Sequence, residues 1–244
     1  MAVSILINTK TNMKKTVFLF FLSFIGLNFA QAQKIGVYYG TNTNFISNDI
    51  DIVFNEISAT SGLPVEKDRK YKSDWGREYG LTYRTDVSHA FSLEYNLGYQ
   101  KLVTVLQETI TEGSERKTNS YDFDQSYVIL RPTLHFWLND NWSFTGNTTL
   151  RMGLGGNFHQ YTAPVGGEKG VFTAGENNVF DENHLDMGLG INYEMDMGLG
   201  LYLNYQKPVL NFNSSPVDDY RPLSTVAFGI SFRIDKVKLE KFGK

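Results

Sequence analysis

The chain alternates apolar and polar residues with a period of two over eight separate segments. The clearest case lies near the C-terminus, where Val226, Phe228, Ile230 and Phe232 alternate with small or polar residues. This period is typical of a β-strand with one apolar and one polar face. The eight predicted strands are 35–40, 75–84, 91–100, 128–138, 142–155, 185–193, 199–206 and 226–234.

The connections between these segments alternate in length. Three are short, at 85–89, 139–141 and 194–198, and four are long, at about 47–72, 108–120, 157–182 and 209–220. Short turns at one end and long loops at the other, with an even number of strands, are typical of a membrane-spanning barrel. The sequence therefore predicts an all-β protein, an eight-stranded antiparallel up-and-down transmembrane β-barrel over residues 33–234.

The polar face of the strands decides which side meets lipid, because a soluble lipocalin-like barrel would show the same alternation with its apolar face inward. That face carries many glycines, which would weaken strands on a solvated surface but leave room for larger side chains inside a narrow barrel. It also carries charges of both signs, which must be paired if they are enclosed. We therefore expect an interior charge network of Glu78, Arg84, Glu94, Arg131, Arg151, Asp186 and Arg233.

The apolar face has aromatic residues at both ends and aliphatic residues between them, as the two interfaces of a bilayer select. At the loop end these aromatics are Trp75, Tyr99 and Tyr205. At the turn end we expect an aromatic girdle of Tyr83, Phe91, Phe136, Trp142, Tyr193 and Phe232.

Three residues fit this pattern poorly. Arg77 and Lys101 fall on the lipid-facing register, which is tolerable if they lie at the loop-end interface and extend their charges into the headgroups. Pro132 falls within a predicted strand and removes a donor from the ladder, so we expect a bulge there.

Residues 1–32 read as an export signal. Met13, Lys14 and Lys15 form a positive start, Val17 to Phe29 an apolar stretch, and Ala30-Gln31-Ala32 a cleavage site. Met13 is accordingly the expected translation start. The mature chain would be carried to the cell outer membrane, with 235–244 as a periplasmic tail.

The composition excludes further classes of function. The chain has no cysteine, which excludes disulfides and thiol chemistry. Without residues 1–32 it keeps 20 basic and 26 acidic residues, a net charge of −6, and it shows no basic run, so we expect no nucleic-acid partner.

With these features the chain resembles the small outer-membrane β-barrel proteins of Gram-negative bacteria, the PorT-like outer membrane protein beta-barrel domain family, with the OmpA-type eight-stranded architecture. The resemblance rests on the signal ending Ala30-Gln31-Ala32-Gln33, on glycine-alternating strands such as 187–191 and 198–201, and on the aromatic last strand Val226 to Phe232. It implies lipid, lipopolysaccharide and the barrel assembly machinery as partners. Many such barrels end on an aromatic residue read by that machinery, and Phe232 and Phe242 are the candidates here.

No residue pattern indicates catalysis. The histidine of a lipid A deacylase-like site would lie in a His-x-Ser motif, which is absent around all four histidines. Asp181, Glu182, His184 and Asp186 could ligate a divalent cation, but a solvated acidic loop base is the favoured interpretation. We therefore expect no catalytic residue, no cofactor and no metal.

The sequence thus favours an integral outer-membrane protein with a structural or surface-binding role through long extracellular loops, whose ligand it does not identify. The alternatives are a porin-like narrow channel for small solutes, a lipid A-modifying barrel enzyme and, if the chain is soluble, a lipocalin-like binder.

Overall fold

The computed structural model describes residues 34–45, 66–112, 115–164, 170–176, 183–212 and 224–234. The export signal, the tail 235–244 with Phe242, and the parts of the long connections at 46–65, 113–114, 165–169, 177–182 and 213–223 lie outside the described residues. In the described part of the chain, no helix has the length and apolar character needed to cross a membrane.

Ten strands make up the described structure. They are β1 (Lys34–Phe45), β2 (Glu66–Ser73), β3 (Gly76–Asp86), β4 (Phe91–Glu112), β5 (Glu115–Trp137), β6 (Trp142–Pro164), β7 (Gly170–Glu176), β8 (His184–Glu194), β9 (Leu199–Asn211) and β10 (Ser224–Arg233).

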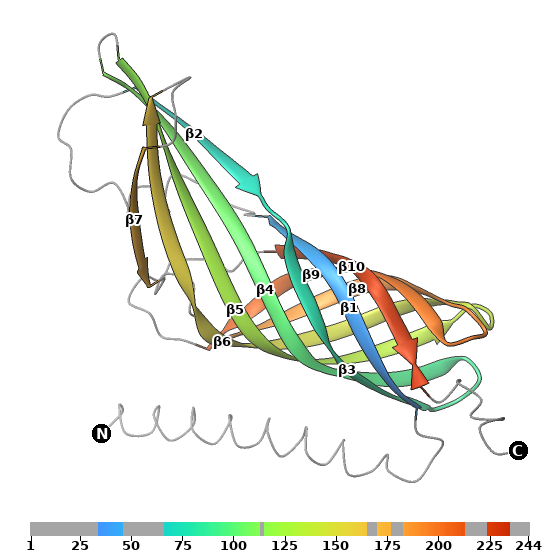
Figure 1. Cartoon of the computed structure of the whole chain (residues 1–244). Helices are drawn as coiled ribbons and strands as arrows, with labels where there is room; N and C mark the ends of the chain where they lie inside the picture. The colour runs from blue at the N-terminus through green and yellow to red at the C-terminus, as the bar shows by residue number, and fades with distance from the viewer. Residues whose placement is uncertain are drawn as a thin grey trace, which may run out of the picture.

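Eight of the strands close into a ring. Going round it, β1 pairs with β3, β3 with β4, β4 with β5, β5 with β6, β6 with β8, β8 with β9, β9 with β10, and β10 again with β1, all antiparallel. The ring is seen in Figure 1 as the barrel that contains the blue and red strands side by side. Closure leaves no open edge in the ring, which is the condition for a sheet to cross a membrane. The predicted eight-stranded antiparallel barrel is confirmed.

The apolar residues point outward and the polar residues inward. Leu81, Leu97 and Leu189 are 59%, 54% and 72% exposed, although they lie mid-strand in the barrel wall. Inward positions hold buried side chains such as Glu78, Gln100 and Arg131. An exterior this apolar is stable only against lipid, because large exposed apolar surfaces are rare on soluble proteins.

Three strands run far beyond the barrel. β4 has 22 residues and β5 and β6 have 23 each, about twice the ~9–11 residues that cross a bilayer. Their outer parts (103–112, 115–124 and 157–164) pair with each other, with β2 on one side and β7 on the other. We call these five segments the extension; it rises from one end of the barrel in Figure 1.

The extension corrects the expected loops. Residues 108–120 are almost wholly strand, 66–72 belong to β2, and 157–164 and 170–176 are strands as well. The alternation is hard to read there because both faces are mixed: Thr104 and Glu108 face inward and are buried, and Val103 and Val105 lie on the outward face. Leu106, Tyr121 and Phe123 face inward and are buried, whereas their outward neighbours, such as Gln107 and Asp122, are polar.

The bulge expected at Pro132 lies elsewhere. The β5–β6 register is the same on both sides of Pro132, since Leu130 pairs with Leu150 and Thr133 with Asn147. The shift falls between Ser126 and Tyr127, opposite Gly155, whose φ of +93° favours glycine. Pro132 has no partner in the β5–β6 pairing, so its missing backbone donor breaks no pair of that ladder.

Close approach explains two of the inward glycines. A Cβ on Gly98 would lie 2.3 Å from the hydroxyl of Tyr38 and 2.3 Å from the Tyr79 carbonyl oxygen. A Cβ on Gly80 would meet the Tyr38 ring at 2.8 Å. The glycines therefore make the space that the Tyr38 side chain occupies inside the barrel.

We predict that Gly98→Ala lowers the free energy of unfolding by about 1–3 kcal/mol, because the added methyl group overpacks the interior. Gly146→Ala is the matched control, since a Cβ on Gly146 meets nothing within 4 Å. Urea unfolding of both variants in lipid vesicles measures the difference. Equal stability of the two variants would contradict this packing.

Candidate functional site

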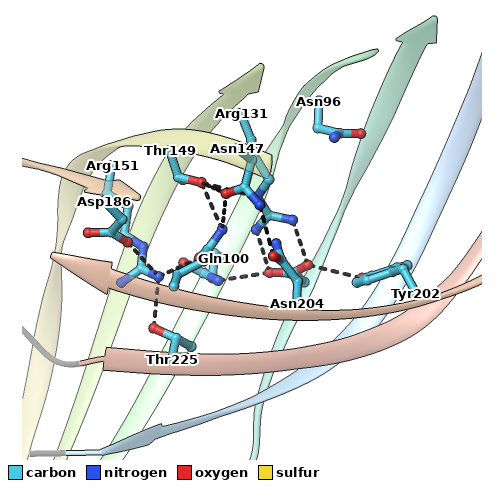
Figure 2. A network of polar contacts seen from close by, with 12 residues as sticks. Asn96, Gln100, Arg131, Asn147, Thr149, Arg151, Asp186, Tyr202, Asn204 and Thr225 are labelled. Carbon is cyan, nitrogen blue, oxygen red and sulfur yellow. Dashed lines mark hydrogen bonds and ion pairs between the residues drawn. The ribbon is translucent and has the colours of Figure 1, made fainter. Parts of the chain in front are cut away.

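The barrel interior holds the densest set of polar contacts in the described structure, and Figure 2 shows its central part. At its centre, Arg131 of β5 donates two hydrogen bonds to the Glu78 carboxylate of β3, at 3.1 and 2.9 Å. Gln100 and the Tyr202 hydroxyl donate to the same carboxylate, at 2.8 and 3.0 Å. Glu78 is 0% exposed. Because β9 supplies Tyr202, the contacts cross the lumen from one wall to the other.

A second ion pair lies beside the first. Arg151 of β6 contacts Asp186 of β8 at 2.9 Å, and both side chains are fully buried. The Arg151 guanidinium also donates to Gln206 and to Thr225, each at 2.8 Å. His184 lies 3.3 Å from this guanidinium. Four strands are thus joined through one side chain.

Neutral side chains connect the two ion pairs. Thr149 accepts hydrogen bonds from Arg131 at 3.2 Å and from Gln206 at 2.7 Å. Asn147 donates to Asn204 at 2.8 Å. The central cluster is therefore one continuous network, and the close-up in Figure 2 shows these groups pointing toward one another.

The turn end of the barrel contains a third charged cluster. Arg84 of β3 contacts Glu94 at 2.5 Å and Glu194 at 2.6 Å, and Arg233 of β10 also pairs with Glu194. The imidazole of His135 lies 3.7 Å from Glu94. Two arginines thus share two carboxylates, with Glu194 between them.

The structure places all seven of the expected interior charges on the inward face and brings them into three groups: Glu78 with Arg131, Arg151 with Asp186, and Arg84, Glu94 and Arg233 around Glu194. Sequence reasoning missed Glu194, because it assigned this residue to a turn. The signal was available, since Asp186, Gly188, Gly190 and Asn192 share its parity along the same strand.

Little free space remains between the central and turn-end clusters. A cavity of about 40 Å³ lies there, lined among others by Tyr38, Arg131 and His135. This volume suits a few water molecules and no larger solute. A wider hollow of about 570 Å³ opens at the turn end, with Asp86, Asn139 and Arg233 in its lining.

The six residues of the expected turn-end girdle lie on the outward face. Phe91 and Phe136 pack together with ring centroids 5.2 Å apart, and Trp142 packs on Tyr193 at 4.8 Å. Tyr83 contacts Tyr95 at 6.4 Å, and Phe232 is 38% exposed. The girdle contains these pairs because the rings come from directly opposed residues of adjacent strands.

The structure gives only part of the candidate cation site. Asp181 and Glu182 lie outside the described residues, while His184 and Asp186 point inward and contact Arg151. The described ranges contain no group of three or more potential ligands. A cation is a poor fit at the inward pair, because the Arg151 guanidinium already neutralises Asp186.

The fold and this interior define the class of the protein: it is a transmembrane β-barrel with a polar, tightly filled interior. No protein-family profile matches the chain, and no curated protein matches it. The resemblance to the PorT-like family therefore stays an expectation.

Solved barrel structures show a distant likeness. Ail of Yersinia pestis, in complex with the heparin analogue sucrose octasulfate, is 14% identical with a TM-score of 0.38, covering 82% of this chain and 97% of Ail. OprG of Pseudomonas aeruginosa is 10% identical with a TM-score of 0.40, covering 83% and 96%. The NanC porin is 9% identical with a TM-score of 0.27, covering 81% and 98%. At these scores the likeness bears on neither fold nor function, and both are taken from the chain's own strand pairing and side chains.

We predict that Glu78→Ala destabilises the barrel by about 3–5 kcal/mol, because it leaves the buried Arg131 guanidinium without its carboxylate. The double variant Glu78→Leu/Arg131→Met removes both charges and should recover most of this loss. Equilibrium unfolding in lipid vesicles checks both. A single variant as stable as the wild type would contradict the role given to this pair.

Proposed function

We propose that the chain is an outer-membrane protein of a Gram-negative cell that presents the extension at the cell surface and binds a partner through it, without catalysis. The proposal is carried by one observation: the same three strands form both the barrel wall and the extension. The barrel half of β4, β5 and β6 encloses a filled interior, and the other half stands beyond the apolar band with polar residues outside.

The outward side chains change character along each strand. On β4, Leu97 in the barrel is followed by Lys101, and in the extension Val103 and Val105 are followed by Gln107 and Thr109. On β5, Val128 gives way to Asp124 and Asp122. A lipid-facing surface would remain apolar over this length, so the extension stands in water.

The extension has a core of its own. Leu106, Tyr121 and Phe123 on its inner face are 0%, 4% and 2% exposed. Sheets of this kind hold a binding surface more rigidly than irregular loops do, because strand pairing fixes the backbone. The extension is therefore suited to recognition of a partner outside the membrane.

The interior favours binding over the small-solute channel. Arg131 and Glu78 meet Tyr202 from the opposite wall, and Arg84 of β3 meets Glu194 of β8. These contacts cross the lumen at two levels, which disfavours the passage of solutes between the two ends. The lipid A-modifying enzyme is the weaker alternative, because each inward histidine of the described barrel, His135 and His184, lies against a charged group of the interior clusters.

The first test is one of orientation, and it uses the absence of cysteine from the chain. Asn157→Cys places a thiol on the exposed outer face of the extension, and Asp140→Cys places one on the exposed turn between β5 and β6. In intact cells a membrane-impermeant maleimide should label Asn157→Cys and leave Asp140→Cys unlabelled until the outer membrane is permeabilised. The reverse pattern would contradict the proposed orientation.

The second test is one of binding. Both cysteine variants are purified in nanodiscs, coupled to a bulky polyethylene-glycol maleimide, and applied to arrays of oligosaccharides and purified extracellular proteins. The uncoupled protein should bind at least one arrayed probe, and coupling at Asn157→Cys should abolish that binding by steric exclusion. Coupling at Asp140→Cys should leave it unchanged. Absence of any bound probe, or equal loss with both variants, would count against recognition through the extension.

A further inference from the structure

The lipid-facing wall of β3 and β4 carries three successive pairs of directly opposed residues. Leu81 lies opposite Leu97, Tyr79 opposite Tyr99, and Arg77 opposite Lys101. Each step along the strands is two residues, or about 6.6 Å, so the cation pair lies ~13 Å from the aliphatic pair. The wall thus passes from aliphatic to aromatic to cationic toward the loop end.

Two like charges directly opposite each other on neighbouring strands repel and destabilise the pairing. Here they are poorly neutralised. Lys101 contacts Asp124 at 2.5 Å, while Arg77 is exposed and makes no ion pair within the described residues. The adjacent Glu78 faces inward and is bound to Arg131, and the carboxylate of Asp74 accepts a hydrogen bond from the backbone nitrogen of Trp75.

In another pair of directly opposed cations in the barrel, carboxylates neutralise both charges. Lys34 of β1 lies opposite Arg84 of β3. Lys34 pairs with Asp86, and Arg84 pairs with Glu94 and with Glu194, which also pairs with Arg233, so each of these three cations has a carboxylate partner. Of Arg77 and Lys101, only Lys101 has such a partner within the described residues. An anion from outside the protein would supply the missing charge.

The fold itself does not need charge at this level. Following the strand pairing outward from Arg77 and Lys101, the corresponding positions hold Thr41 on β1, Ser126 on β5 and Gly155 on β6. Uncharged residues are therefore sufficient for pairing there. The doubled cation on β3 and β4 is a local feature of this wall.

We propose that this wall binds a phosphorylated membrane lipid, with the phosphate held between Arg77 and Lys101. The tilted Tyr79 and Tyr99 rings, 5.3 Å apart, would lie beneath the headgroup, and the acyl chains would run along Leu81 and Leu97. The exposed Trp75 ring packs edge-on against Phe228 and borders the site. The order of charge, aromatic ring and aliphatic surface matches the order of phosphate, interface and acyl chain in a lipid.

The assignment to lipid A of the outer leaflet rests on the proposed orientation, in which the extension faces the outside of the cell. Arg77 and Lys101 lie at the base of the extension, and the outer leaflet of a Gram-negative outer membrane presents phosphorylated lipid A there. Its phosphate groups are stronger partners for a guanidinium than a zwitterionic headgroup.

The test measures lipid retained by the whole purified protein in native mass spectra. Wild type is mixed in detergent with lipid A, phosphatidylglycerol or phosphatidylcholine, and should retain lipid A best and phosphatidylcholine least. In Arg77→Gln/Lys101→Gln, lipid A retention should fall by roughly tenfold or more, because two interfacial cations are lost. The conservative variant Arg77→Lys/Lys101→Arg should retain it.

Lys207→Gln is the matched control. Lys207 is also an exposed, lipid-facing cation, two residues beyond the aromatic Tyr205, but it lies opposite the uncharged Met187. This variant should retain lipid A as the wild type does. Heat-dependent migration on SDS gels verifies that each variant is folded.

Several results would overturn the proposal. Retention unchanged in the double glutamine variant, or reduced equally by Lys207→Gln, would show no specific site. Displacement by millimolar inorganic phosphate would indicate a free-phosphate site, and equal retention of phosphatidylglycerol would remove the assignment to lipid A. Failure of the array experiment with intact lipid retention would count against the proposed function alone, because the lipid site lies on the barrel wall.

Discussion

The structure depends on pairing charges inside a barrel whose outside is apolar. Arg131 and Glu78 are nearly or fully inaccessible to water, and an unpaired charge at either position would cost several kcal/mol of stability. Their bidentate contact removes that penalty, and Gln100 and Tyr202 satisfy the carboxylate further. The same solution recurs with Arg151 and with Arg84. Each arginine contacts residues from more than one strand, so the pairing that neutralises the charges also fixes the register of the ring.

The filled interior and the extension are linked through the strands themselves. β4, β5 and β6 form the barrel wall at one end and the extension at the other, with continuous backbone pairing between β4 and β5. A partner bound to the extension would therefore rest on a sheet anchored by the buried ion pairs. At the boundary between the two parts, Arg77 and Lys101 lie opposite each other at the base of the extension, where the proposed lipid site is placed.

Much of the fold could be predicted from the sequence, because lipid on one side and a polar interior on the other impose a strict period of two. This period alone assigns Leu81 to the lipid-facing side of the sheet and Glu78 to the interior. The partners of the interior charges could not be predicted, since Arg84 finds Glu194 across the lumen and 110 positions away in the chain. The strands of the extension could not be predicted from the sequence for a different reason. In the extension the outward face carries Gln107 and Asp122 beside Val105, and the inward face gains Leu106 and Phe123, so the pattern that marks a membrane strand is lost. The bulge predicted at Pro132 was wrong because a closed sheet tolerates one missing donor when residues on both sides hold the register.

The most direct test of the central claim, a closed barrel with charges inside and lipid outside, is heat modifiability of the protein in the outer-membrane fraction. A sheet closed by eight paired strands resists SDS, so the unboiled protein should migrate differently from the boiled, unfolded chain. Recovery of the protein in the membrane fraction with this shift is the result that the structure predicts. A soluble protein found in the periplasm or medium, with identical migration before and after boiling, would contradict it and would mean that the apolar face meets something other than lipid.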